Sequence, residues 1–195
     1  MIVLACGALA SEIMALKKLN GWEHLELTCI PAQIHNRPKQ IPEAVRQKVL
    51  ELKKKNKPVF VAFADCGTGG QLDKVLDELG VERLAGAHCY EFYAGSDVFS
   101  QLHEEDLGTL YLTDFLARHF DALIIRGMGI DRYPEIEEML FGNYNRLVYL
   151  QQSVNEDLVN RAKAAAERLG LSFEQRFTGY GDLGTTLTVW AGGTV

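Results

Sequence analysis

The sequence predicts an α/β fold with a mostly parallel, Rossmann-like sheet in three layers and helices on both faces. Apolar runs without strict polar alternation recur along the chain, and most of them precede an amphipathic segment of helical period. Strands that are buried on both faces and joined by helical crossovers are typical of parallel sheets. The 195 residues contain no fixed-period repeat and no low-complexity linker, so we expect a single α/β domain over residues 1–195.

Strand and helix alternate regularly in the first half of the chain. Pro42 suits the first turn of a helix, and Gly80 suits the position just after a helix end. The run from Pro58 to Ala64 is apolar on both faces and leads directly into a glycine-rich loop. The expected strands cover residues 1–5, 25–30, 58–64 and 83–87, and the expected helices cover 9–19, 42–55 and 71–79.

The second half is less regular. Residues 122–126 form an apolar run that fits a helix or a strand, and the last residues form a glycine-rich tail. We expect right-handed crossovers throughout, as in other parallel sheets. The expected helices cover residues 107–120, 134–141 and 155–169, and the expected strands cover 147–150 and 171–177.

Composition and charge exclude several classes of protein. A hydrophobic content of 47% with 24% charged residues excludes a disordered chain, a collagen and a coiled coil. The net charge of −6 disfavours a protein that coats nucleic acid or anionic lipid. No apolar run approaches the ~20 residues of a membrane span, and five residues before Cys6 are too few for an export signal. We therefore expect a cytoplasmic protein with reduced cysteines, and neither nucleic acid nor membrane as a partner.

Soft ligands and titratable groups follow four successive expected strands. Cys6 ends the first strand, His35 follows the second, Cys66 ends the third, and His88 and Cys89 end the fourth. The carboxyl ends of parallel strands meet at one edge, where ligands of open α/β sheets bind. Cys29 lies within its strand, and we expect it to be a small core residue.

The sequence therefore predicts that at least three of these side chains meet around a metal ion or form one reactive cluster. The candidate ligands are Cys6, His35, Cys66, His88 and Cys89. Thiolate and imidazole suit zinc or iron, and three ligands with an open position would make a Lewis acid. The alternative is that each cysteine is a buried core residue, since free cysteine is among the most buried residue types.

A second hypothesis makes Cys66 a metal-free nucleophile. It precedes a glycine loop near an expected helix start, a position that lowers the pKa of a thiol. The N–H groups of Gly67, Gly69 and Gly70 could hold an anionic cofactor, and Arg37 could clamp its carboxylate or phosphate. The loop lacks the P-loop lysine and the spacing of a dinucleotide site, so a tight turn is the alternative.

Residues 88–95 combine an imidazole, a thiol, phenols and a carboxylate. Glu91 is a candidate catalytic acid or base, or a residue that orients a ligand histidine. The alternative is a solvated carboxylate at a helix start. The aromatic residues of this stretch are core packing or the wall of a small-molecule pocket.

Taken together, these motifs resemble the DUF1638 family, a domain of unknown function, over nearly the whole chain. No catalytic residues are assigned in that family. The resemblance implies a role in corrinoid-dependent one-carbon metabolism, beside corrinoid proteins and methyltransferases. The motifs that carry it are Cys6-Gly7, residues 35–38, 65–70, 88–95 and 112–116, and 141–144 leading to 147–150.

Three functions remain open from the sequence. The first is a metal-dependent enzyme of group transfer, most of all methyl transfer, with a small-molecule substrate. The second is an accessory protein that binds a corrinoid protein, a cofactor or a metal without catalysis. The third is the metal-free cysteine enzyme.

Overall fold

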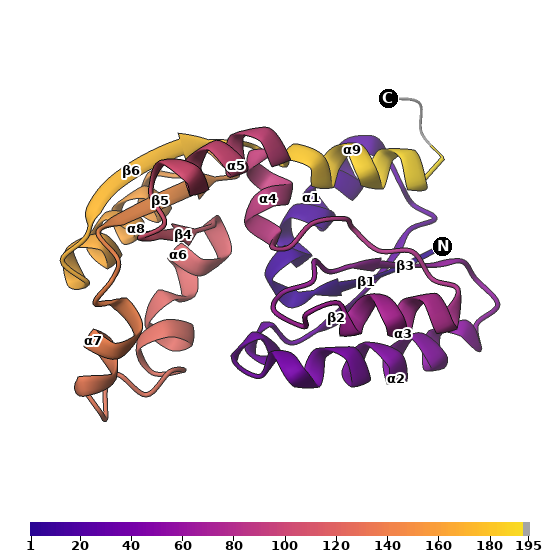
Figure 1. Cartoon of the computed structure of the whole chain (residues 1–195). Helices are drawn as coiled ribbons and strands as arrows, with labels where there is room; N and C mark the ends of the chain where they lie inside the picture. The colour runs from indigo at the N-terminus through magenta and orange to yellow at the C-terminus, as the bar shows by residue number, and fades with distance from the viewer. Residues whose placement is uncertain (193–195) are drawn as a thin grey trace. The chain divides into compact units, whose positions relative to one another are not determined.

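The computed structural model describes residues 1–192, which divide into two compact units. Unit 1 comprises residues 1–92 and 182–192, and unit 2 comprises residues 93–181. Within the described residues each unit holds one parallel three-stranded sheet with helices, which confirms the α/β class (Figure 1). The expected single sheet is thus replaced by two sheets. The assignment of residues 1–195 to a single domain stays a prediction.

The sheet of unit 1 has the order β2 (Glu26–Ile30), β1 (Ile2–Cys6), β3 (Val59–Ala62). All pairs are parallel, with Cys6 opposite Ile30 and Ala5 opposite Ala62. Every residue of β1 is buried, because this strand is central and covered on both faces. That burial explains why its sequence is continuously apolar.

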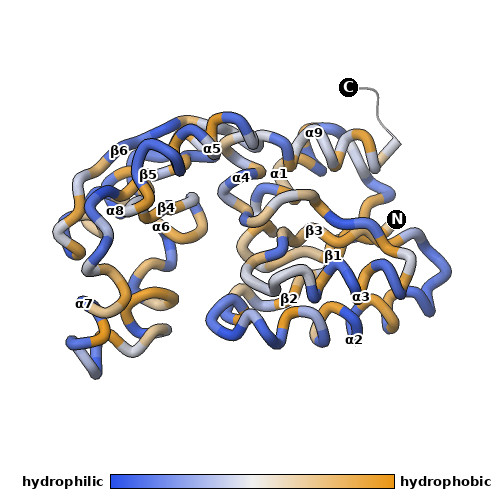
Figure 2. Tube along the Cα trace, in the orientation of Figure 1, coloured by the Kyte–Doolittle hydropathy of each residue, from blue (hydrophilic) through white to orange (hydrophobic). Residues whose placement is uncertain are grey.

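Helices cover both faces of this sheet. Figure 1 places α2 (Ile41–Lys53) and α3 (Gln71–Leu79) on one side, with α1 (Ala10–Asn20) and α9 (Gly181–Trp190) on the other. In Figure 2 hydrophobic and hydrophilic colours alternate along α2 and α3, as expected for helices with one face on a core. The loops after β1 and β2 contain short 3₁₀ helices at Gly7–Leu9, Ala32–Asn36 and Pro38–Gln40.

Unit 2 contains a sheet of order β4 (Thr109–Leu112), β5 (Arg146–Gln151), β6 (Ser172–Phe177). A buried carboxylate links the carboxyl ends of β4 and β5: Asp114 accepts hydrogen bonds from the Tyr149 hydroxyl at 2.6 Å and the Gln152 N–H at 3.0 Å. The helices are α5 (Ser96–Glu105), α6 (Asp114–Phe120), α7 (Glu135–Phe141) and α8 (Glu156–Arg168), and α4 (Cys89–Ala94) spans the boundary between the units.

A π-helical turn, Asp121–Ile125, follows α6 directly. It occupies the apolar run that fitted a helix or a strand in the sequence. His119, just before it, has φ −114° and ψ 17°, outside helical values. The chain therefore changes direction and helical pitch between α6 and Arg126.

Three sequence predictions of secondary structure are wrong. Residues 107–120 are not one helix, because 109–112 pair with β5 and Thr113 caps α6 by accepting the Leu116 N–H. Residues 83–87 form only an isolated bridge between Arg83 and Val61. The glycine-rich tail contains α9, where Leu183 and Leu187 lie one turn apart and are fully buried.

Cys29 is exposed rather than part of the core. Its strand, β2, lies at the edge of the sheet, so one side of the strand is uncovered. Among the described residues, no helix has the length and apolar character needed to cross a membrane.

Candidate thiol site

Cys6 and His35 meet at the carboxyl edge of the unit 1 sheet. Cys6 is the last residue of the central strand, and His35 lies in the 3₁₀ helix after β2. The Cys6 Sγ is 3.7 Å from His35 Nδ1. Gly7 permits this approach, since a Cβ there would lie 3.3 Å from both the Ala32 nitrogen and the Ile30 oxygen.

The His35 ring is oriented by its neighbours. Its Nδ1 lies 2.9 Å from the Ala32 carbonyl oxygen, which only accepts, so Nδ1 carries the proton. The ring is parallel to that of Phe63, with centroids 6.2 Å apart. Burial lowers the pKa of His35, and the imidazole is neutral at pH 7. This tautomer leaves the lone pair of Nε2 for a ligand, an arrangement common among metal-binding histidines.

Cys66 begins the loop after β3 in a left-handed conformation, with φ +52°. Few residues other than glycine adopt this region, and such outliers cluster at functional sites. The Cys66 N–H donates to the Ala87 carbonyl at 2.9 Å, and Gly67 packs beside Pro38 of the loop after β2. The loops after β2 and β3, together with residues 86–87, therefore gather around the end of β1.

The Asp65 carboxylate organises this loop from within. It accepts hydrogen bonds from the Thr68 hydroxyl at 2.5 Å, the Gly69 N–H at 3.0 Å and the Gly70 N–H at 2.8 Å. Two of the three glycine N–H groups predicted to hold an anion are therefore already occupied. Partial burial raises the pKa of Asp65, but the hydrogen bonds outweigh it and hold the pKa below its ordinary value.

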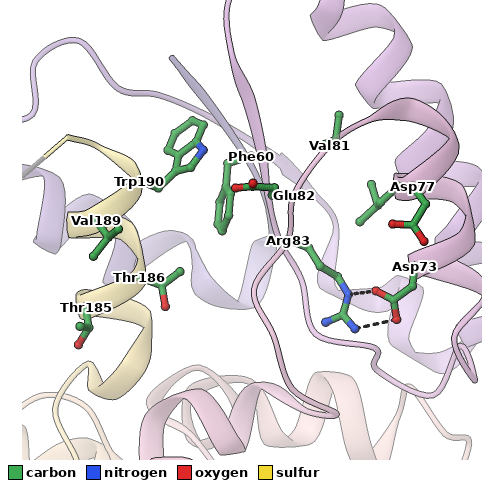
Figure 3. Close-up of a pocket in the computed structure, with 11 residues that line it drawn as sticks. Phe60, Asp73, Asp77, Val81, Glu82, Arg83, Thr185, Thr186, Val189 and Trp190 are labelled. Atoms are coloured by element: carbon green, nitrogen blue, oxygen red, sulfur yellow. Dashed lines mark hydrogen bonds and ion pairs between the residues drawn. The ribbon is translucent and has the colours of Figure 1, made fainter.

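Arg83 fixes the segment that leads to Cys89. Its guanidinium pairs with Asp73 of α3 through two contacts, of 2.6 and 2.9 Å, drawn in Figure 3. It also donates to the carbonyls of Leu84 at 2.5 Å and Gly86 at 3.3 Å. Residues 82–87 consequently lie along the edge of β3, although they form no regular strand.

Arg83 also lines a cavity of about 560 Å³ that is bounded by residues of both α3 and α9. Figure 3 shows Phe60 and Trp190 among the residues that line this cavity, together with Asp77 and Glu82. The cavity is lined by none of the predicted site residues.

Burial and mutual repulsion keep the three thiols protonated. Burial raises the pKa of Cys6 to about 12, against the hydrogen bond from Ala8, and negative charge at Cys66 adds to the rise. Burial raises the pKa of Cys66 to about 11. Burial also raises the pKa of Cys89, with further rises from Cys66 and Cys6. The Cys66 N–H donates a hydrogen bond to the carbonyl of Ala87, two residues before Cys89, and Cys6 contacts His35. We call Cys6, Cys66, Cys89 and His35 the thiol site.

The direction of the Cys66 shift is opposite to the one that the glycine loop predicts. Gly70, and not Cys66, is the residue at the start of α3. The Cys66 side chain is partly buried, and this burial is the main cause of its raised pKa. A group that releases its proton near pH 11 is a poor nucleophile at pH 7.

The donor set of the thiol site fits a thiophilic metal ion by its chemistry. Three thiols and a neutral imidazole are the ligands that zinc and iron prefer. Within residues 1–192, however, no three His, Cys, Asp or Glu side chains are arranged so that they could hold a metal ion. Binding would therefore require the thiols to rotate together and to lose their protons, which a cation promotes.

The other predicted site residues lie around this group. His88 is exposed, and its ring is tilted against Tyr90 at 6.2 Å. Glu91 accepts the Ala87 N–H at 2.9 Å, which makes it a cap for the turn before α4. Arg37 is exposed between the two 3₁₀ helices after β2.

The comparisons with known proteins give one result. The family described as "Protein of unknown function (DUF1638)" matches residues 29–187. The chain belongs to the DUF1638 family. The match includes every predicted site residue of this DUF1638 chain except Cys6. No curated protein and no solved structure matches it.

Sequence reasoning missed the residues that support the site. The sequence places Asp65 at a strand end but does not predict that it caps the loop, and it predicts a strand that begins at Arg83. An Asp followed by Thr and Gly at the third to fifth positions is a sequence sign of a capped loop. The pairing of Arg83 with Asp73 has no such local sign.

Proposed function

We propose that this DUF1638 chain is a metal-dependent group-transfer enzyme whose ligands are Cys6, Cys66, Cys89 and His35. The observation that supports this is the contact of Cys6 Sγ with His35 Nδ1, at 3.7 Å, at the carboxyl edge of a parallel sheet. Cys66 and Cys89 belong to neighbouring segments, which the hydrogen bond from the Cys66 N–H to the Ala87 carbonyl joins. Ionisation of these three thiols is unfavourable without a nearby cation, because burial disfavours the charged thiolate. Because a bound zinc or iron ion supplies that charge, it would convert the thiols into ligands.

The ion would act as a Lewis acid if one coordination position stayed open. His35 is held in the correct tautomer by the Ala32 carbonyl, and the Asp65 loop holds Cys66. His88 is exposed and would contact a substrate or supply a further ligand. Glu91 would act as acid or base after leaving the Ala87 N–H, and Arg37 would bind an anionic group of the substrate.

The reaction that we propose is methyl transfer in corrinoid-linked metabolism, with a corrinoid protein or a methyltransferase as partner. This finer statement rests on the family resemblance and not on the geometry. The cytoplasmic location belongs to the same proposal and is supported by four free cysteines. The raised pKa of Cys66 makes the metal-free cysteine enzyme the weaker alternative.

We also propose that unit 1 is a small Rossmann-like domain in three layers. The strand order β2-β1-β3, all parallel, is the beginning of the flavodoxin-like order. Helices on both sides of the sheet support the assignment. In such folds, the edge that carries the thiol site is the ligand-binding edge.

The deciding experiment is metal analysis of untagged protein purified without oxygen, with zinc, iron and cobalt measured together. We expect nearly one zinc or iron per chain, retained in Cys29→Ser and lost in Cys6→Ser, Cys66→Ser and Cys89→Ser. Cys29 is a matched control because it is an exposed cysteine of the edge strand β2 and is not one of the proposed ligands. Equal metal content in all four variants, or none in the wild type, would refute the proposal.

A turnover assay distinguishes the catalytic proposal from the accessory alternative. Metal-loaded protein is mixed with methylcobalamin and a small thiol, and demethylation is followed by visible absorption. Metal-dependent turnover that Cys66→Ser abolishes is the expected result. Stable binding of a corrinoid protein without turnover would favour the accessory alternative.

A further inference from the structure

Unit 2 contains a pocket rich in arginine that the proposed function does not use. It has a volume of about 420 Å³ and lies between α8 and the segment formed by α6 and the π-helical turn. That volume is within the range of small-molecule sites, roughly 300–1,000 Å³. The charged residues that line it are Arg118, His119, Asp121, Arg126, Arg161 and Arg168.

Two of the four guanidinium groups are already neutralised. Arg161 pairs with Asp157 at 2.7 Å, and Arg168 pairs with Glu137 at 2.8 Å. Among the described residues, Arg118 and Arg126 have no ion-pair partner. Asp121 carries the only carboxylate that lines the pocket within residues 1–192. The pocket thus keeps unneutralised positive charge in a chain whose net charge is −6.

The backbone of this segment departs from an ordinary helix. In an unbroken α-helix, position 126 lies about 80° around the axis from position 118. Here the chain bends at His119 and then widens into the π turn, where the Arg126 N–H donates to the Asp121 carbonyl at 2.8 Å. Both arginines line one pocket in this segment. Single π turns are rare in proteins, and those that occur are often found at functional sites.

We propose that this pocket binds a small molecule bearing a phosphate group, held by the guanidinium groups of Arg118 and Arg126. Two planar guanidinium forks without partners match the charge and the several oxygen atoms of a phosphate dianion. Arg161 and Arg168, held in place by their carboxylate partners, form the sides of the pocket. The pocket and the thiol site are made by different residues, so one can be tested without the other.

The test is calorimetric titration of the full chain with pyrophosphate and with inorganic phosphate at constant ionic strength. We expect saturable binding at one site, reduced at least tenfold in the double variant Arg118→Gln, Arg126→Gln. Arg132→Gln is the matched control, because Arg132 is an exposed arginine of unit 2 outside the pocket, and it should bind as the wild type does. Circular dichroism establishes that each variant is folded.

Three outcomes would overturn the proposal. The first is phosphate binding no tighter than chloride at the same ionic strength. The second is unchanged binding in the double variant, which would place the anion elsewhere. The third is citrate binding as tightly as pyrophosphate, which would mean that the pocket takes carboxylates rather than phosphate groups.

Discussion

At the scale of single residues, Cys66 is notable for its backbone conformation. Its left-handed backbone, at φ +52°, is one that glycine adopts without cost. We expect Cys66→Gly to be more stable than Cys66→Ala by about 1 kcal/mol, because alanine keeps the Cβ and its strain. Urea unfolding at pH 7 measures the difference. Greater stability of the alanine variant would contradict the left-handed assignment.

The enclosed thiols should make the stability of metal-free protein depend on pH in the alkaline range. Unfolded thiols ionise near pH ~8.5. Folded Cys66 and Cys6 keep their protons up to pKa values of about 11 and about 12. Between these values the folded state binds more protons, so stability falls as pH rises. Below pH ~8 the thiols are protonated in both states and contribute no pH dependence.

The measurement is urea unfolding of wild type and Cys6→Ser at several pH values from 8 to 10. The wild type should lose stability more steeply with rising pH, since the serine variant lacks one of these protons. Parallel curves would show that Cys6 does not have a raised pKa in the folded protein.

The positions of the site cysteines could be predicted because strand ends are visible in sequence. Cys6 and Cys66 follow apolar runs that any parallel sheet would bury. The exposure of Cys29 could not be predicted, because it depends on which strand lies at the sheet edge. The protonation of Cys66 was also missed, because its thiol is enclosed by loops distant in sequence.

At the scale of elements, the loop from Asp65 to Gly70 is stabilised by hydrogen bonds to the Asp65 carboxylate. Asp65→Asn should lower the free energy of unfolding by roughly 1–3 kcal/mol, because hydrogen bonds to a charged acceptor are lost or weakened. Asp77→Asn is the matched control, since Asp77 is an exposed residue of the following helix. Urea unfolding of both variants at pH 7 provides the comparison. Equal effects would mean that the loop does not depend on this cap.

Residues 82–87 should depend on Arg83 for their order. Arg83→Ala removes the donors to Leu84 and Gly86, so the segment should separate more readily from β3. We expect faster hydrogen exchange of the Asp65 and Cys66 amides, which donate to Gly86 and Ala87. Arg46→Ala, which breaks a pair with Glu78, is the control and should leave these amides unchanged. Unchanged exchange in Arg83→Ala would mean that the backbone alone holds the segment.

The elements that the sequence predicted well are long and periodic, such as residues 71–79 and 155–169. Strand β4 was not recognised because four residues are too few to show a period, and its neighbours resemble a helix. Helix α9 was not recognised because its glycines disfavour a helix in isolation. The burial of Leu183 and Leu187 in unit 1 outweighs that preference.

For the whole molecule, the division into units predicts different behaviour of fragments. Unit 2 is continuous in sequence and has its own core, which includes Leu147, Tyr149 and Leu158. A fragment of residues 93–181 should therefore fold alone and unfold cooperatively. A fragment of residues 1–92 lacks α9 and should not.

Circular dichroism with thermal unfolding of the two fragments measures this difference. Restoring 182–192 through a short linker in place of unit 2 should recover a cooperative transition in unit 1. A fragment 1–92 that already unfolds cooperatively at the same temperature would refute the prediction. The single sheet that the sequence predicted was wrong for a related reason, since local patterns do not reveal which strands pair.

The return of the chain to unit 1 also sets the order of events during translation. Residues 93–181 are synthesised before 182–192, so the sequence of unit 2 is complete while unit 1 still lacks α9. During that interval the helix that carries Leu183 and Leu187 has yet to cover its side of the first sheet. The nascent chain therefore passes through a stage in which Cys6, Cys66 and Cys89 have all been synthesised but the unit that encloses them is incomplete.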